Sequence, residues 1–166
     1  MANEAETTQP QYEDPAEGLF AFGDEDGAIP ETLIPRGTEA NVRVVGVPSI
    51  KAGVGEPSAK YVEGYRYAML KITLEAPDHS ASPFIDGTIM FPSPDDSPRD
   101  TNRKAAHFGE AKKALGWTPP PGFVPLQNDG QEFPELAGAE ACVVVGQKFN
   151  KGRGEIENIV QKWVVR

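Results

Sequence analysis

Residues 97–117 read SPRDTNRKAAHFGEAKKALGW, and their apolar side chains recur at the spacing of an amphipathic α-helix. Asp100 or Thr101 would cap the start of this helix, and Gly116 would end it in the left-handed conformation. We expect it to be the one helix of the chain. Its buried stripe is predicted to consist of Ala105, Phe108, Ala111, Ala114 and Leu115.

Three stretches before the helix have the alternating pattern of β-strands, at 39–47, 65–75 and 87–91. The segment 48–64, between the first two, is rich in Gly, Pro and Lys and is predicted to be a loop. The inward face of the first strand would carry Ala40, Val42 and Val44. The inward face of the second strand would carry Ala68, Leu70, Ile72 and Leu74.

Two further strands are predicted after the helix, at 140–149 and 155–166, joined by the turn NKGRG. The resulting order is three strands, one helix and two strands. That is the order of an OB-fold, a small five-stranded Greek-key barrel of the all-β or small α+β class, with its helix between strands 3 and 4. Because strand order cannot be read from one sequence, another five-stranded α+β domain is the alternative.

Charge is distributed unevenly along the 166 residues, whose formal net charge is −9. Residues 1–31 hold nine acids and no Lys or Arg, which leaves sixteen acids and sixteen bases in residues 32–166. We therefore divide the chain into an acidic, flexible N-terminal arm, 1–31, and a neutral OB-like nucleic-acid-binding domain, 32–166. The arm residues expected to contact a partner are Phe20, Phe22, Asp24, Glu25 and Asp26.

The sequence has few features of a membrane protein or an enzyme. No apolar run approaches membrane-spanning length and no secretory signal is recognisable, so we expect the cytoplasm, of a cell or of an infected host. No phosphate-binding loop is present, His79 and His107 are far apart, and Cys142 is expected to be a small buried hydrophobe. Asp95 and Asp96 could hold a divalent ion, but we expect no enzyme activity, no cofactor and no metal.

In an OB barrel the binding surface is the outer face of strands 2 and 3, together with the loops joining strands 1–2 and 4–5. Aromatic rings there would stack on bases, and cations would follow the phosphates. The predicted stacking residues are Tyr61, Tyr65, Tyr67, Phe91 and Phe149. The predicted phosphate-binding residues are Lys51, Lys60, Lys71, Lys148, Lys151 and Arg153. Alternatively, the tyrosines cover a second packing layer or face solvent, and the hairpin lysines serve solubility.

Several segments carry a resemblance to a known family. They are IPRGTEANVRVVGV, YAMLKITLEAP and GTIMFPSP in the first half, and AAHFGEAKKALGW and PELAGAEACVVVGQKFNKGRGEIENIVQKW in the second. Together they resemble a phage-encoded group of small proteins that accompany recombination and replication genes. Members of that group are similar to single-stranded-DNA-binding proteins with an OB-fold. The resemblance, from about Pro35 to Trp163, implies sequence-tolerant binding of single-stranded DNA in phage DNA replication or recombination.

The acidic arm departs from the usual replication proteins, whose acidic Phe-containing tail lies at the C-terminus. We expect the arm to modulate DNA binding by occupying the basic groove, or to recruit replication or recombination proteins. It could instead pack on the barrel through Leu19, Phe20 and Phe22. The alternative function is a protein–protein interaction module, such as a virion component or a host-enzyme inhibitor, that acts through the arm. No membrane partner is expected, and the edge strands of a small barrel would permit a homo-oligomer.

Overall fold

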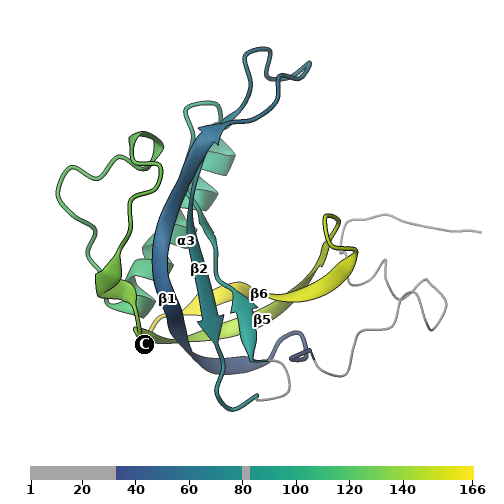
Figure 1. Ribbon diagram of the computed structural model, residues 1–166, viewed down its shortest axis with the longest axis vertical. Helices are drawn as coiled ribbons and strands as arrows, with labels where there is room; N and C mark the ends of the chain where they lie inside the picture. Colours follow the sequence, from purple (N-terminus) through teal and green to yellow (C-terminus); the bar gives the residue numbers. More distant parts are fainter. Residues whose placement is uncertain (1–32, 80–82) are drawn as a thin grey trace, which may run out of the picture.

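The computed structural model describes residues 33–79 and 83–166 (Figure 1). The predictions for the arm residues lie outside this part of the chain: Phe20, Phe22, Asp24, Glu25 and Asp26. The described elements are, in chain order, β1 (Glu39–Val54), β2 (Arg66–Glu75), β3 (Phe84–Asp86), β4 (Ile89–Met90), the α-helix α3 (Pro98–Leu115), the 3-10 helices η1 (Pro125–Gln127) and η2 (Pro134–Leu136), β5 (Glu140–Asn150) and β6 (Glu155–Val164).

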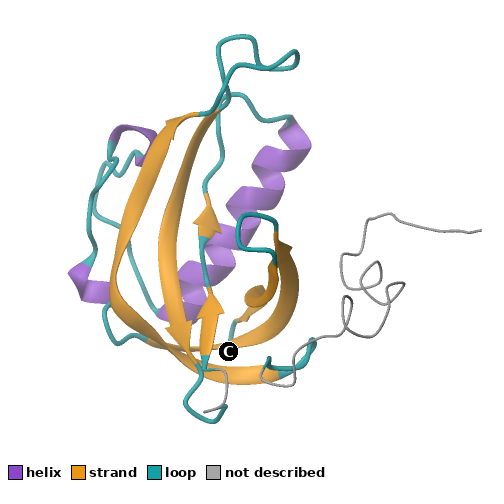
Figure 2. Cartoon of the chain, turned by 45° about the vertical axis from the view of Figure 1, so that its right-hand side comes forward, coloured by secondary structure: helices purple, strands orange, loops and turns teal. Residues whose placement is uncertain are grey.

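The strands close into a five-stranded barrel (Figure 2). β1 pairs antiparallel with both β2 and β5, while β5 pairs antiparallel with β6, and β2 with β3. A parallel pairing between β3 and β6, at Asp86 and Ile159, completes the ring. β4 adds a short pairing on β2, so that β3 and β4 together take the place of the predicted third strand. The predicted OB-like barrel, with its helix between strands 3 and 4, is therefore confirmed.

β1 is longer than predicted, and the assignment of 48–64 as a loop is wrong as far as Val54. The cause is a bulge, because Gly46 has a φ of 71° and the register with β2 shifts just after Val45. Glycine adopts this left-handed conformation without a steric cost, and the extra residues bend the strand. Beyond the bulge Pro48 and Ile50 return to the core. The first half of β1 can thus follow β5 while the second half follows β2.

The third strand is split, whereas the sequence predicted one continuous strand at 87–91. Gly87 and Thr88 separate β3 from β4. Gly87 is buried, and a Cβ at this position would lie 2.9 Å from Cδ1 of Leu74. Glycine therefore allows the connection to pass close to β2. The split also brings Phe84, which precedes the predicted strand, into the sheet.

Both caps of α3 can be identified. Ser97 is the N-cap, because its Oγ accepts a hydrogen bond from the N–H of Asp100 at 3.2 Å. The prediction of Asp100 or Thr101 as the cap is therefore wrong. Pro98 follows as the first helical residue, a position where the missing N–H costs nothing. Gly116 ends the helix with a φ of 62°, which confirms the predicted left-handed cap.

Burial in α3 is concentrated in its second half. The helix buries Ala111 and Leu115 and packs Phe108 and Ala114 against the core. Ala105 is exposed, so its predicted place in the buried stripe is wrong. The first half of the helix instead lies against the polar loop that follows β4, where Lys104 meets Asp96. Within the described residues, none of the helices has the length and apolarity needed to cross a bilayer.

The barrel interior is apolar, and segment 118–138 closes it on one side. Trp163 is the largest fully buried side chain of the core. Segment 118–138 runs beside the second half of β1, where the N–H of Gly130 donates to the carbonyl of Ile50 at 2.8 Å. The N–H of Ile50 in turn donates to the carbonyl of Gln131 at 2.8 Å. This edge of β1 is therefore already paired and is unavailable to another chain.

Two buried amide side chains anchor the chain where it enters the barrel. Asn158 accepts a hydrogen bond from the N–H of Ile34 at 2.9 Å and donates one back to its carbonyl oxygen at 2.9 Å. Gln147 donates to the same carbonyl at 3.0 Å. Buried backbone groups need such partners because leaving them unpaired is costly. The anchor therefore fixes Ile34 against β5 and β6.

Candidate nucleic-acid interface

The candidate interface starts from the outer face of β2. Closure of the barrel buries alternate residues of this strand, as the sequence predicted, and turns the others outward. The residues turned outward are Tyr67, Met69, Lys71 and Thr73, which we call the β2 outer face. On the neighbouring strand, Lys51 lies opposite Met69 and Ser49 lies opposite Lys71. One aromatic ring, one thioether and two lysines therefore share one surface.

Tyr67 rests on a glycine of the neighbouring strand. Gly53 is its cross-strand partner, and a Cβ at Gly53 would lie 3.1 Å from the Tyr67 hydroxyl oxygen and 3.4 Å from Cζ. The tyrosine thus occupies space that only a glycine leaves open. Because Tyr67 is only partly buried, part of its ring remains at the surface. This geometry fits the prediction that Tyr67 points away from the core.

Two more tyrosines pair at the base of the β1–β2 loop. The ring centroids of Tyr61 and Tyr65 are 5.0 Å apart with an interplanar angle of 58°. The ammonium of Lys60 lies 5.3 Å from the centroid of Tyr61. The loop is ordered by its own backbone, because the N–H of Gly55 donates to the carbonyl of Tyr65 at 2.8 Å. The N–H of Gly64 donates to the carbonyl of Tyr61 at 2.9 Å.

Asp96 and Lys104 hold the hydroxyl end of Tyr65. The Tyr65 hydroxyl donates to the carboxylate of Asp96, and Lys104 Nζ donates to the Tyr65 oxygen at 2.7 Å and to Asp96 Oδ2 at 3.1 Å. The side chains of Asp96 and Lys104 are only 4% and 11% exposed. Burial raises the pKa of Tyr65, with the hydrogen bond to Asp96 acting in the same direction. Tyr65 is therefore protonated at neutral pH and acts as a hydrogen-bond donor.

The carboxylates of Asp95 and Asp96 have cationic partners. Burial disfavours ionisation of Asp96, but hydrogen bonds from Tyr65, the Ser93 N–H and Lys104 outweigh it and lower the pKa. Hydrogen bonds from Arg66 lower the pKa of Asp95 to about 2. Across residues 33–79 and 83–166, no group of three or more His, Cys, Asp or Glu side chains is arranged to hold a metal ion.

The predicted phosphate-binding residues divide into two groups. Over the described ranges, the five lysines have no carboxylate within ion-pair distance: Lys51, Lys60, Lys71, Lys148 and Lys151. Arg153 differs, because it pairs with Glu157 and lies 3.7 Å from Glu155. Its charge is thus already balanced within the hairpin. The positive charge of these five lysines is therefore available to a phosphate.

A groove of about 510 Å³ lies between β2, β3 and the β5–β6 hairpin. Its lining includes Lys71 and Thr73 from β2, Phe84 from β3 and Arg153 from the hairpin. Leu33, at the start of the described chain, also lines it. Phe84 is 57% exposed and was missed in the sequence analysis. The alternation of PFIDG, residues 83–87, was the signal that could have identified it as outward-facing.

The aromatic residue predicted for strand 3 is the wrong one. Phe91 is only 3% exposed, and its ring packs edge-on against Phe108 and Phe123 at centroid distances of 4.9 and 5.7 Å. A base cannot reach it. The split between β3 and β4 explains the error, because Phe84 faces outward in β3 while Phe91 follows β4 with an inward orientation.

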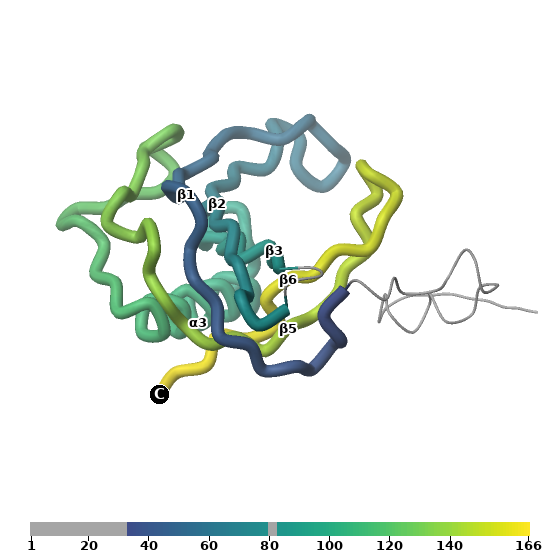
Figure 3. Tube along the Cα trace, turned by 60° about the horizontal axis from the view of Figure 1, so that its bottom comes forward, coloured from purple at the N-terminus to yellow at the C-terminus, as the bar shows by residue number. Residues whose placement is uncertain are grey.

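The remaining predicted residues lie on the β5–β6 hairpin. Phe149 is 38% exposed and lies opposite Ile156, while Lys148 is exposed and lies opposite Glu157. Lys151 is exposed in the turn. The β1–β2 loop extends from the top of the barrel in Figure 1 and this hairpin projects from its right-hand side, and Figure 3 shows both on the same side of the molecule. The predicted residues therefore form two groups that the β2 outer face connects, rather than a single cluster.

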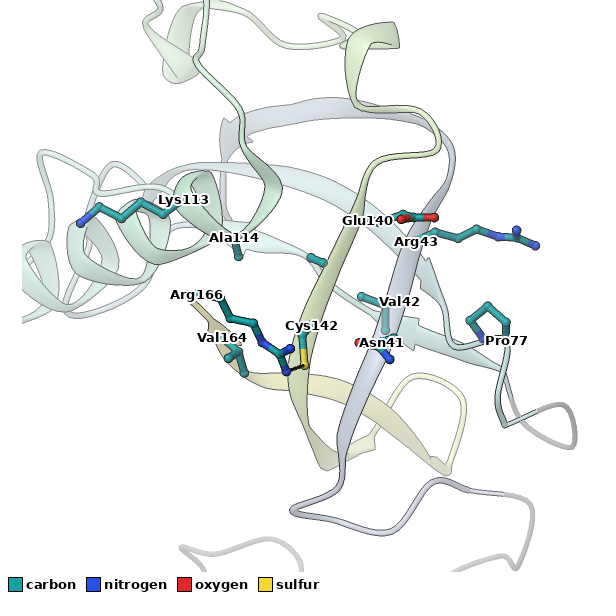
Figure 4. A pocket seen from close by; sticks show the side chains of 11 residues that line it. Asn41, Val42, Arg43, Pro77, Lys113, Ala114, Glu140, Cys142, Val164 and Arg166 are labelled. Atoms are coloured by element: carbon teal, nitrogen blue, oxygen red, sulfur yellow. Dashed lines mark hydrogen bonds between the residues drawn. The ribbon is translucent and has the colours of Figure 1, made fainter.

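A second hollow lies on another side of the barrel, between β1, β5 and the end of α3 (Figure 4). Arg166 Nη2 lies 3.2 Å from the sulfur of Cys142, which is buried as predicted. Lys113 and Arg43 point away from the hollow in different directions. These two cations therefore do not converge on a common point.

No family model matches the sequence, and no curated protein matches it either. The barrel, the β2 outer face and its neighbouring loops therefore carry the functional argument.

Proposed function

We propose that the protein binds single-stranded DNA, without strong sequence preference, along the β2 outer face. The observation that carries this proposal is the combination of partly exposed tyrosines with lysines that have no acidic partner in the described chain. Aromatic rings stack on any base, and cations track any phosphate backbone. A surface that offers both is suited to sequence-tolerant binding.

The spacing of the side chains supports an extended strand. Successive outward residues of a β-strand are about 6.6 Å apart. Tyr67, Met69 and Lys71 thus form a line of roughly 13 Å. Tyr61 and Tyr65 extend this line at one end, and the groove containing Phe84 extends it at the other. Several consecutive nucleotides could lie along this line.

The resemblance to phage recombination and replication proteins gives the biological setting of the proposal. We infer a phage-type protein that protects or organises single-stranded DNA during replication or recombination. The acidic arm would compete with DNA or recruit replication or recombination proteins. Leu33, the first described residue, lines the same groove as Lys71.

Oligonucleotide titration tests the proposal. Full-length protein should retain labelled oligo-dT at low salt and release it as salt rises, whereas duplex DNA should bind more weakly. Tyr67→Ala should weaken oligo-dT binding by roughly ten-fold, because one stacked base contributes about 1–3 kcal/mol. The midpoint of urea unfolding should change little. Equal losses of folding and affinity would instead identify Tyr67 as a structural residue.

Lysine variants test the path of the phosphates. The logarithm of affinity falls with the logarithm of salt concentration, with a slope of about −0.7 for each phosphate neutralised on a single strand. Lys71→Ala should therefore reduce this slope by about 0.7. Lys113→Ala is the matched control, since Lys113 is exposed on α3 and lines the other hollow. An equal effect of both variants would contradict a track along β2.

The acidic arm also favours a second candidate, a protein–protein interaction module that acts through residues 1–31. Nine acids without a base would suit a partner with a basic surface. This candidate predicts no retention of oligo-dT at low salt. It also predicts that the activity resides in the arm, so the same titration distinguishes the two functions.

A further inference from the structure

The Tyr65 contacts have a geometry that bears on how the proposed site is built. Lys104 Nζ is 2.7 Å from the Tyr65 hydroxyl oxygen but 5.3 Å from the ring centroid. An atom at these two distances lies close to the line that runs from the centroid through the hydroxyl. The ammonium is therefore beyond the edge of the ring rather than above its face. Tyr65 is held at its polar end, and the aromatic surface remains for neighbours.

Tyr65 is also fixed relative to Tyr61, whose ring leans against it at a centroid distance of 5.0 Å. The Tyr65 backbone is tied to the residue that follows β1, because its carbonyl accepts the Gly55 N–H. Ring, hydroxyl and backbone are thus each attached to a different part of the protein. The two rings have a defined orientation without a ligand.

The cluster is suited neither to nucleophilic catalysis nor to binding a phosphate through Lys104. Asp96 is stabilised as the carboxylate and Tyr65 as the protonated phenol, which disfavours transfer of the phenolic proton to make Tyr65 a nucleophile. Lys104 is bonded to both Tyr65 and Asp96, so its charge is already compensated. Buried ion pairs are in general no more stabilising than apolar residues of the same size. Stability alone therefore gives no reason for a charged pair at this position.

We propose that Asp96 and Lys104 are positioning residues, which hold the rings of Tyr65 and Tyr61 in the orientation that receives a base before DNA arrives. This inference rests on the proposed function. A side chain that is already ordered loses less conformational entropy on binding than a mobile one. The start of α3, which lies apart from the β2 outer face in sequence, would thereby contribute to DNA affinity without touching DNA.

Three variants separate positioning from contact. Tyr65→Phe keeps the ring and removes the hydroxyl, while Lys104→Met removes the ammonium and keeps most of the stem. The double variant Asp96→Asn/Lys104→Met removes both buried charges, so no unpaired charge remains to unfold the protein. Each should weaken oligo-dT binding about three- to ten-fold. None should change the salt slope, because Lys104 is not a phosphate contact.

Nuclear magnetic resonance of ring-labelled tyrosine measures how fast the Tyr65 ring flips. A general loss of stability would not change the flipping of this ring alone. Slow flipping of the Tyr65 ring should give separate signals for its two edges in the wild-type protein. In Lys104→Met and in the double variant, both of which keep Tyr65, these signals should average while the remainder of the spectrum is preserved. Lys113→Met, on the same helix, should change neither the ring signals nor the affinity.

The outcomes distinguish this inference from the proposed function. If the wild-type protein fails to bind oligo-dT, the proposed function is wrong and the positioning role falls with it. If the wild type binds and Tyr65→Ala weakens binding, but the folded double variant binds like the wild type, only the positioning role is overturned. A salt slope that decreases by about 0.7 in Lys104→Met would also overturn it, by making Lys104 a direct phosphate contact.

Discussion

Asp95 and Arg66 form the best-connected exposed ion pair next to the candidate site. The Arg66 N–H donates to Asp95 Oδ2 at 2.9 Å, and the guanidinium donates at 3.0 Å from Nε and 2.7 Å from Nη2. The pair joins the first residue of β2 to the loop that leads into α3. It lies one residue from both Tyr65 and Asp96, so its integrity affects the site as well as the fold.

This pair predicts a specific acid sensitivity. The Asp95 pKa is about 2 in the folded protein, below its ordinary value of 3.8. A lowered carboxylate pKa adds stability that is present above the unfolded value and is lost as pH falls toward the folded value. Asp95→Asn should therefore reduce the loss of stability between about pH 4 and pH 2, while lowering stability at neutral pH.

Urea unfolding of both proteins at closely spaced pH values checks this prediction. Asp78→Asn is the control, because the Asp78 side chain is exposed and has no hydrogen-bond or ion-pair partner among the described residues. Parallel stability–pH curves for wild type and Asp95→Asn would mean that Arg66 does not favour the ionised carboxylate.

Residue-scale inference from the sequence succeeded where one face of a strand is buried. On β2 the alternation correctly separated the core residues from Tyr67 and Lys71. It chose Phe91 instead of Phe84 because the break at Gly87 divides the strand, and alternation cannot be followed across such a break. The pairing of Arg153 with two glutamates was also missed, since side-chain partners depend on how the hairpin folds.

At the scale of elements, the β1–β2 hairpin carries most of the site. Its length was underestimated because Pro48 and the Gly- and Lys-rich residues that follow it were predicted to be a loop. In the structure Gly46 makes a bulge, and the carbonyl of Pro48 accepts a hydrogen bond from Phe133. A proline is tolerated where its missing N–H is not needed for the ladder. Local composition therefore concealed a strand that long-range pairing stabilises.

Gly64 is the residue on which the closing of this hairpin depends. Its φ is 88°, and a Cβ there would lie 2.4 Å from the Gly55 carbonyl oxygen. Gly64→Ala should therefore lower the free energy of unfolding by about 1–3 kcal/mol, part of it from the left-handed backbone. It should also weaken oligo-dT binding several-fold by displacing Tyr61 and Tyr65.

Gly122→Ala isolates the contribution of the backbone. Gly122 has a φ of 70°, but nothing lies within 4 Å of a Cβ at that position. This variant should lose only the roughly 1–2 kcal/mol of the left-handed conformation and should bind DNA normally. Equal effects of the two variants on DNA binding would show that the close approach of Gly64 to Gly55 does not organise the loop.

At the scale of the whole molecule, the element order was predictable but the anchoring was not. Periodicity identified the sequence of strands and helix, and this order suggested the barrel. The closing pair of β3 and β6 involves Asp86 and Ile159, which no local pattern connects. The same is true of the Ile34 anchor on Asn158. Both depend on contacts between residues far apart in the chain.

The acidic residues are concentrated in the N-terminal arm, so the arm's effect on DNA binding can be tested by removing it. Residues 1–31 contain nine acids, whereas residues 32–166 are neutral overall. Leu33, the first described residue, lines the same groove as Lys71. If the arm competes with DNA, deletion of residues 1–31 should strengthen oligo-dT binding several-fold at low salt. The gain should shrink at about 0.3 M salt, because salt then screens charge–charge interactions beyond several ångströms.

A full-length variant with the nine acids replaced by Asn or Gln separates charge from length. It should bind as tightly as the truncated protein if electrostatic competition is the cause. A gain seen only on truncation would indicate instead that the arm covers the groove by its bulk. Unchanged affinity in both variants would remove competition altogether, leaving recruitment of partner proteins as the role of an arm that carries all of the net negative charge.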